Sequence, residues 1–189
     1  MNYKSIPLLI MALSLQAISG TAFSDDDDRG GSYSKYYRSS GSSGVAPVNN
    51  KKYQDECGSC HFAYQPGLLP ARSWSKMMHD LENHFGENAE LVAEDVAQIS
   101  QYLEDNAADR SSYKRSRKIM KSMRSSSTPL RITETPYIIR KHDELSHRMV
   151  EDNPQVVSIS RCKACHTRAE TGSYSESQIN IPGVGRWHD

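Results

Sequence analysis

"ECGSCHF" (residues 56–62) and "RCKACHT" (residues 161–167) are the two stretches that decide the fold. In each, two residues separate a pair of cysteines, and a histidine directly follows the second cysteine. The chain of 189 residues has four cysteines, and all of them lie in these two motifs. Any interpretation of the cysteines therefore has to explain why a histidine stands at the same place in both copies.

Three kinds of site compete for this pattern. A zinc site can use Cys57, Cys60, Cys162 and Cys165, but it leaves the two histidines unexplained. A thiol oxidoreductase needs one reactive C-x-x-C motif and no second copy with a trailing histidine. Covalent haem c uses all six residues, because each thiol adds to one vinyl group of the porphyrin and the next histidine binds the iron.

The motifs therefore predict two covalently bound haem c groups as cofactors. The residues expected to hold haem 1 are Cys57, Cys60 and His61, and those expected to hold haem 2 are Cys162, Cys165 and His166. In both cases the histidine is an axial ligand of the iron. The motifs leave open which side chain is the sixth ligand of each iron.

For haem 1, residues 73–86 predict one amphipathic helix that begins with a capping serine and ends with a glycine. At about 100° per residue, His84 lies beside the apolar face of this helix, whereas His79 lies on the polar face. We therefore expect His84 to be the sixth ligand and His79 to face water. Met77 and Met78 lie on the apolar face and remain alternatives, because His/Met ligation is common in c-type cytochromes.

For haem 2, a helix is predicted to begin with Thr135 as its cap and Pro136 at its first position. His142 lies on the apolar face of this helix, whereas His147 projects about 140° away from His142, toward solvent. We therefore expect His142 to be the sixth ligand of haem 2. His188, near the end of the chain, is the alternative if the terminal residues fold back.

The first 24 residues carry one lysine, an apolar run over residues 6–18 and small residues near Ser24, which predicts a secretory signal peptide. A retained membrane anchor is the alternative, but this run is shorter than the ~20 residues that span a bilayer. The mature chain is thus expected to be exported and to lack a transmembrane segment. Because 23 basic residues balance 23 acidic ones, no overall charge indicates nucleic-acid binding.

The mature chain divides into four segments. Residues 25–50 are rich in Ser, Gly and Tyr and are expected to be a disordered leader. Residues 51–109 are expected to form the haem 1 domain, and residues 128–189 the haem 2 domain. Residues 110–127 are strongly basic and are expected to be a connector with a short amphipathic helix.

Several segments between the motifs resemble one known family. The matching segments read ECGSCHFAYQPGLLPARSW, HFGENAEL, YLEDNAAD, LRITETPY, RKHDEL, CKACHT and INIP. Together they are similar to the dihaem cytochrome c (DHC) family of exported bacterial proteins with two bis-histidine haems. By this resemblance His84 and His142 match the positions of the sixth ligands, while residues 25–50 fall outside the matched region. The resemblance also implies a membrane b-type cytochrome as electron donor and a small mono-haem, oxygen-binding cytochrome as acceptor.

We therefore expect a mostly α-helical, two-lobed dihaem cytochrome c with little or no sheet, whose N-terminal lobe is like a class I cytochrome c. It is expected to relay single electrons in the periplasm and not to be an enzyme. The alternatives are a dihaem enzyme subunit, such as a peroxidase or reductase, and a haem-based gas sensor. Both alternatives need an iron with an open or easily opened position.

Overall fold

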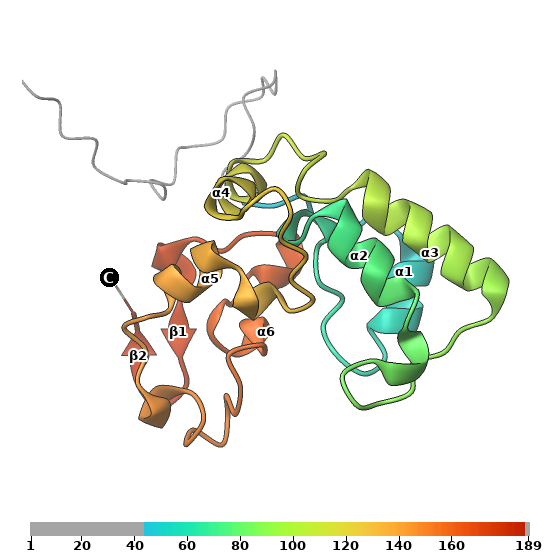
Figure 1. Cartoon of the computed structure of the whole chain (residues 1–189). Helices are drawn as coiled ribbons and strands as arrows, with labels where there is room; N and C mark the ends of the chain where they lie inside the picture. The colour runs from blue at the N-terminus through green and yellow to red at the C-terminus, as the bar shows by residue number, and fades with distance from the viewer. Residues whose placement is uncertain (1–43, 188–189) are drawn as a thin grey trace, which may run out of the picture.

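The computed structural model describes residues 44–187, which form two lobes (Figure 1). One lobe holds helices α1 to α3, and the other holds helices α4 to α6 with a small sheet. Among the described residues the fold is mostly helical with one two-stranded sheet, so the predicted fold class is confirmed. None of the helices in this part of the chain is long and apolar enough to cross a membrane. The expected signal peptide and His188 lie outside the described residues.

The first lobe packs its helices around one apolar core. Its α-helices are α1 (Lys51–Cys57), α2 (Ala71–Met78) and α3 (Ala93–Asp105), and its short 3₁₀ helices are η1 (Pro66–Leu68) and η2 (Leu81–Asn83). The side chain of Asn50 caps α1 by accepting the backbone N–H of Tyr53 at 2.9 Å. The buried residues of the core are Tyr53, Leu69, Trp74, Met78, Ile99, Leu103 and Ala107. Because α1 ends at Cys57, this packing holds the first motif at the edge of the lobe.

The single helix predicted for residues 73–86 is wrong in its bounds. Helix α2 begins directly after Pro70, so Ser73 lies inside the helix, buried, instead of capping it. The helix ends at Met78 because Asp80, with φ −136° and ψ 47°, has left the helical conformation. His84 therefore lies beyond the helix, and its direction is set by the turn that follows.

The second lobe is built from shorter elements. They are α4 (Lys114–Ser122), η3 (Ile132–Glu134), α5 (Pro136–Lys141), η4 (His147–Met149), α6 (Cys162–Cys165), η5 (Ala169–Thr171), η6 (Glu176–Gln178), β1 (Asn180–Ile181) and β2 (Gly185–Arg186). The two strands pair antiparallel, with Asn180 opposite Arg186. Helix α5 has Pro136 at its first position, as predicted, but the Thr135 hydroxyl donates to the carbonyl oxygen of Ile132 instead of capping the helix, and the helix ends before His142.

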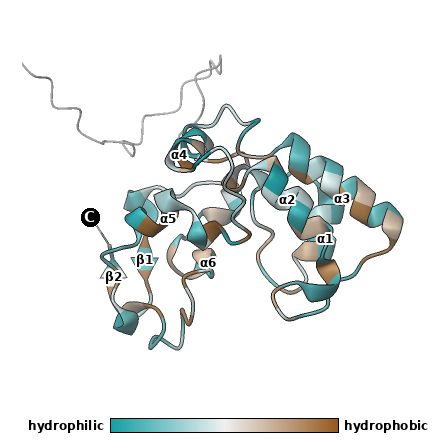
Figure 2. Cartoon of the chain, in the orientation of Figure 1, coloured by the Kyte–Doolittle hydropathy of each residue, from teal (hydrophilic) through white to brown (hydrophobic). Residues whose placement is uncertain are grey.

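The short helix expected within residues 110–127 is present as α4, but both this segment and residues 44–50 pack against the folded protein. Val45 is 1% exposed, and its N–H donates to the carbonyl oxygen of Gly172 at 3.0 Å. It packs with Leu68, Ile119 and Tyr137 in a second apolar core. Residues 44–50 are therefore packed, and α4 is part of the folded protein although Figure 2 shows it as largely hydrophilic. Composition missed both because one buried side chain, Val45 or Ile119, anchors a segment that is otherwise polar.

Candidate functional site

His61 and His84 face each other at the edge of the first lobe. Their ring centroids lie 6.1 Å apart, and the ring planes differ by 18°. Nδ1 of His61 donates to the carbonyl oxygen of Phe62 at 2.7 Å. Because that carbonyl only accepts, Nδ1 carries the hydrogen and Nε2 keeps its lone pair, which is the usual state of a metal-binding imidazole.

A tight turn presents His84 to His61. The N–H of His84 donates to the carbonyl oxygen of Glu87 at 2.8 Å, and the N–H of Glu87 donates back at 3.2 Å. The two residues between them, Phe85 and Gly86, have φ angles of 57° and 101°. A two-residue turn of this kind needs positive φ at both positions, which is rare and unfavourable for phenylalanine. The chain thus holds a strained residue directly next to His84.

The competing side chains of the first lobe lie elsewhere. His79 is exposed, and its Nδ1 hydrogen-bonds the carbonyl oxygen of Ser75 at 2.6 Å. Met78 is buried in the first core, and Met77 packs against that core. The structure therefore places the ring of His84 beside that of His61, whereas the two methionine side chains pack with the first core.

His142 and His166 form a second pair in the second lobe. Their ring centroids lie 6.0 Å apart, with the planes inclined at 75°. His142 follows the last residue of α5, and its Nδ1 donates to the carbonyl oxygen of Ile138 at 2.8 Å, which again leaves the lone pair on Nε2. His147 is 88% exposed and lies 3.2 Å from the carboxylate of Glu151. The structure brings His142, and not His147, to the second motif.

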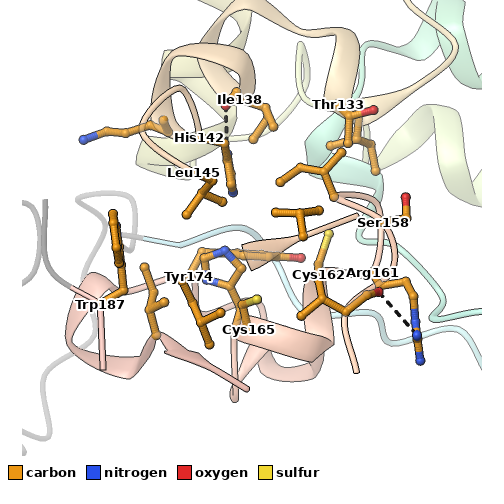
Figure 3. Close-up of a pocket in the computed structure, with 18 of the residues that line it drawn as sticks. Thr133, Ile138, His142, Leu145, Ser158, Arg161, Cys162, Cys165, Tyr174 and Trp187 are labelled. Atoms are coloured by element: carbon orange, nitrogen blue, oxygen red, sulfur yellow. Dashed lines mark hydrogen bonds between the residues drawn. The ribbon is translucent and has the colours of Figure 1, made fainter. Parts of the chain in front are cut away.

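The second pair lines a large cavity. His142 points into it from one side, and Cys162, Cys165 and Tyr174 lie on the other (Figure 3). The empty space inside it is about 1240 Å³, with open solvent at its mouth included. Most of the other lining side chains are apolar: Leu68, Ile132, Ile138, Leu145, Val150, Val156, Ile159, Ile179, Ile181 and Trp187. The cavity therefore suits a mainly apolar ligand.

Burial favours the neutral form of one histidine in each pair by lowering its pKa. It lowers the pKa of His166 to about 4, with smaller contributions from His142 and Arg115. It also lowers the pKa of His84, with help from His61 and Arg131. A neutral imidazole is the form that binds a metal. Nδ1 of His166 is buried without a hydrogen-bond partner, unlike Nδ1 of His61 and His142.

The cysteines do not fit the two competing interpretations. Burial raises the pKa of Cys57 to about 11 and that of Cys162 to about 11, so neither thiol is the ready thiolate of an oxidoreductase. No group of three or more His, Cys, Asp or Glu side chains that could hold a metal ion occurs among residues 44–187. The two motifs instead lie in separate sites, each beside its own histidine pair.

Both sites fit a haem. With metal–nitrogen bonds of ~2.0 Å, two imidazoles on opposite sides of one metal ion have centroids about 6.2 Å apart, close to the observed 6.1 and 6.0 Å. A planar macrocycle would fit between two such rings, and the thiols of the adjacent C-x-x-C motif would attach it. The sequence motif, the ring separations and the apolar cavity all describe the same group.

Sequence reasoning missed the aromatic residues around the pairs. The ring of Tyr64 lies 5.2 Å from that of His61, and the ring of Tyr174 lies 5.3 Å from that of His166. Burial raises the pKa of Tyr64 to about 12. Arg131, from the second lobe, lies 4.1 Å above the ring of Phe85. Only one signal was readable: both tyrosines follow a motif histidine within eight residues.

Comparisons with known proteins agree with this geometry. A family model for dihaem cytochrome c matches residues 53–174. The structure is similar to that of a dihaem cytochrome c from Shewanella baltica OS155, with 45% identity and a TM-score of 0.62 over 74% of this chain and 98% of that one. A dihaem cytochrome c from Rhodobacter sphaeroides gives 46% identity and a TM-score of 0.62 over 69% of this chain and 100% of the other. No curated protein matches the chain significantly.

Proposed function

This chain belongs to the dihaem cytochrome c family, and from this premise we propose that it relays single electrons between redox proteins through two bis-histidine haems. Membership of the family implies two haem c groups, and the cysteine pairs fit their attachment motifs. When bound, each haem supplies an iron that gains and loses one electron. The observation that carries the proposal is the ring separation of 6.1 and 6.0 Å in the two histidine pairs.

The residues of the chain have separate roles in this proposal. Cys57 and Cys60 attach haem 1, while Cys162 and Cys165 attach haem 2. The axial ligands are His61 and His84 for haem 1, and His166 and His142 for haem 2. Backbone carbonyls orient two of these rings: the carbonyl of Phe62 orients His61, and the carbonyl of Ile138 orients His142. The apolar wall around haem 2 excludes water from its iron.

Two axial histidines on each iron favour electron transfer over catalysis. A peroxidase, a reductase or a gas sensor needs a coordination position that substrate or gas can reach. In this chain the geometry supplies a second imidazole at both motifs. The protein therefore needs no substrate pocket, and its exchange of electrons takes place at the haem edges.

The location and partners belong to the same proposal. The signal-peptide pattern of residues 1–24 supports export to the periplasm. The resemblance of the motif and linker segments supports a membrane b-type cytochrome as donor and a small soluble mono-haem cytochrome as acceptor. Cross-linking the holoprotein in a periplasmic extract and in solubilised membranes tests both. Capture of neither class of cytochrome would refute these partners.

The charge pattern supports two different partners. Residues 80–109 hold no lysine or arginine, but nine acidic residues: Asp80, Glu82, Glu87, Glu90, Glu94, Asp95, Glu104, Asp105 and Asp109. Residues 110–124 hold no acidic residue, but seven basic ones: Arg110, Lys114, Arg115, Arg117, Lys118, Lys121 and Arg124. Opposite charge on the two lobes attracts partners of opposite charge. Electron exchange with a basic and with an acidic redox protein should then slow as salt is added.

One experiment tests the ligation. Low-temperature electron paramagnetic resonance of the oxidised holoprotein should show two low-spin haems, and carbon monoxide added to the reduced protein should leave the spectrum unchanged. An immediate carbon monoxide spectrum, or a high-spin haem in the native protein, would show an open iron and favour the enzyme or sensor alternatives.

A further inference from the structure

Two tyrosines cross between the lobes in opposite directions. The hydroxyl of Tyr64, in the first lobe, donates to the carbonyl oxygen of Ser160 in the second lobe at 2.7 Å. The hydroxyl of Tyr174, in the second lobe, donates to Oε1 of Gln65 in the first lobe at 2.6 Å. Because Tyr64 and Gln65 are neighbours in the chain, the two crossings meet at one dipeptide.

Each of these tyrosines also lies against a motif histidine. The ring of Tyr64 lies 5.2 Å from that of His61, and the ring of Tyr174 lies 5.3 Å from that of His166. The two histidines are the expected axial ligands that follow the cysteine pairs. The crossing hydrogen bonds thus begin at one proposed haem site and end close to the other.

Gln65 and Ser160 accept the two crossing hydrogen bonds, and each makes a further contact in the second lobe. Gln65 is 0% exposed, and its Nε2 donates to the carbonyl oxygen of Ala169 at 2.6 Å. The Ser160 carbonyl lies two residues before Cys162, whose Sγ is 3.5 Å from the same oxygen. Buried hydrogen bonds of this kind are stronger than exposed ones and hold their partners at fixed positions.

We propose that Tyr64, Gln65 and Tyr174 form an interlobe bridge that positions the two haems for electron transfer between them. The bridge fixes the spacing of the lobes and fills the space between the sites with bonded and hydrogen-bonded atoms. The step it serves is balanced: one electron leaves the ferrous iron of one haem and reduces the ferric iron of the other, and no bond or proton moves. The inference rests on the proposed haem ligation.

Physical reasons favour a positioning role over simple packing. Electron tunnelling weakens steeply with distance and with every gap that no atom fills. Leu68 of the first lobe packs in the second core, and Tyr64 packs against both cores, so the relative placement of the lobes depends on contacts that cross between them. Two of the bridge residues, Tyr64 and Tyr174, also lie against the rings of His61 and His166.

The test measures electron transfer between the haems in the full holoprotein. Tyr64→Phe and Tyr174→Phe each keep the ring but remove the crossing hydrogen bond. We expect the double variant to slow inter-haem transfer after flash reduction by about tenfold, equivalent to ~1.4 kcal/mol. Pulsed electron paramagnetic resonance should also show a broader distribution of iron–iron distances. Both haems should stay low-spin at unchanged potentials, because the axial ligands are intact.

Tyr53→Phe is the matched control. Tyr53 is buried, and its hydroxyl donates to the carbonyl oxygen of Tyr64 at 2.7 Å, within the first lobe. The Tyr53→Phe variant loses the same kind of hydrogen bond but keeps the hydrogen bonds between the lobes. Its rate of inter-haem transfer should therefore stay within about twofold of the native rate. An equal loss of rate in Tyr53→Phe, or native rate and distances in the double variant, would overturn the bridge.

Gln65→Met is the second variant if the double variant does not fold. It removes both hydrogen bonds of the Gln65 side chain and keeps a similar volume, and it should slow transfer in the same way. A native rate in Gln65→Met would also count against the bridge. Failure of the proposed function would look different, because the native protein itself would then show no low-spin pair of haems.

Discussion

The imidazole planes of His142 and His166 are inclined at 75°, whereas those of His61 and His84 lie within 18° of parallel. The two pairs have nearly the same separation, so the geometry of the rings differs mainly in orientation. The difference arises from the backbone: a tight turn presents His84, and the end of α5 presents His142. Two haems with the same pair of ligands are therefore expected to differ electronically.

Electron paramagnetic resonance should resolve this difference. Parallel imidazoles interact with the same iron dπ orbital and separate the two dπ energies, whereas perpendicular imidazoles leave them nearly equal. Haem 1 should thus give a rhombic low-spin signal, and haem 2 a strongly anisotropic one with a single large g value. A variant with Cys57→Ala and Cys60→Ala should keep only the second signal. Two identical rhombic signals would contradict the ring angles.

The sixth ligand of haem 1 can be tested by removing it. His84→Ala should open one iron, so that the reduced protein binds one carbon monoxide per two haems. His79→Ala is the control, because His79 is exposed and hydrogen-bonded to its own helix. Carbon monoxide binding by His79→Ala, with none by His84→Ala, would show that His79 and not His84 is the sixth ligand.

The sixth ligand of haem 2 can be tested by changing it to methionine. A thioether stabilises ferrous iron better than imidazole does, so His142→Met should raise the potential of one haem. The shift should be on the order of 100 mV, within the ~0.8 V range that axial ligands span. His147→Met should leave both redox titrations unchanged, because His147 is 88% exposed. If neither variant shifts a potential, His188 becomes the candidate ligand.

The sequence analysis misplaced the elements that carry the paired histidines. His84 was chosen from its angle on a helix over residues 73–86, yet α2 ends at Met78 and a turn directs the ring. The resemblance points to the same residue without reference to that helix, and the ring of His84 lies 6.1 Å from that of His61. The turn itself was not predictable, because Phe85 has a positive φ that its residue type disfavours. Likewise, no local pattern marks Val45 as buried, since its partners are distant in the chain.

Gly86 should be the sensitive position of the His84 turn. With φ at 101° and no atom within 4 Å of an added Cβ, Gly86→Ala introduces backbone strain without a clash. The strain should cost about 1–2 kcal/mol of unfolding free energy and displace His84, so that haem 1 becomes partly high-spin. Gly183→Ala is the matched control, with φ at 75° and equally open space. It should lower stability by a similar amount with haem 1 unchanged; a high-spin signal from both variants would point to general unfolding.

Helix α4 should behave as part of the folded core and not as a connector. Ile119 is 0% exposed and packs in the second core with Leu68 and Tyr137, so Ile119→Ala leaves a cavity. The free energy of unfolding in urea should fall by about 2–5 kcal/mol. Arg117 lies on the exposed side of the same helix, so the control Arg117→Ala should change the free energy of unfolding by less than about 0.5 kcal/mol. Equal, small effects of both substitutions would mean that α4 does not pack as described. If only Ile119→Ala destabilises, the apolar side of α4 anchors this helix against the core. The basic side of α4 is then held in a fixed place beside α5, the helix that precedes His142.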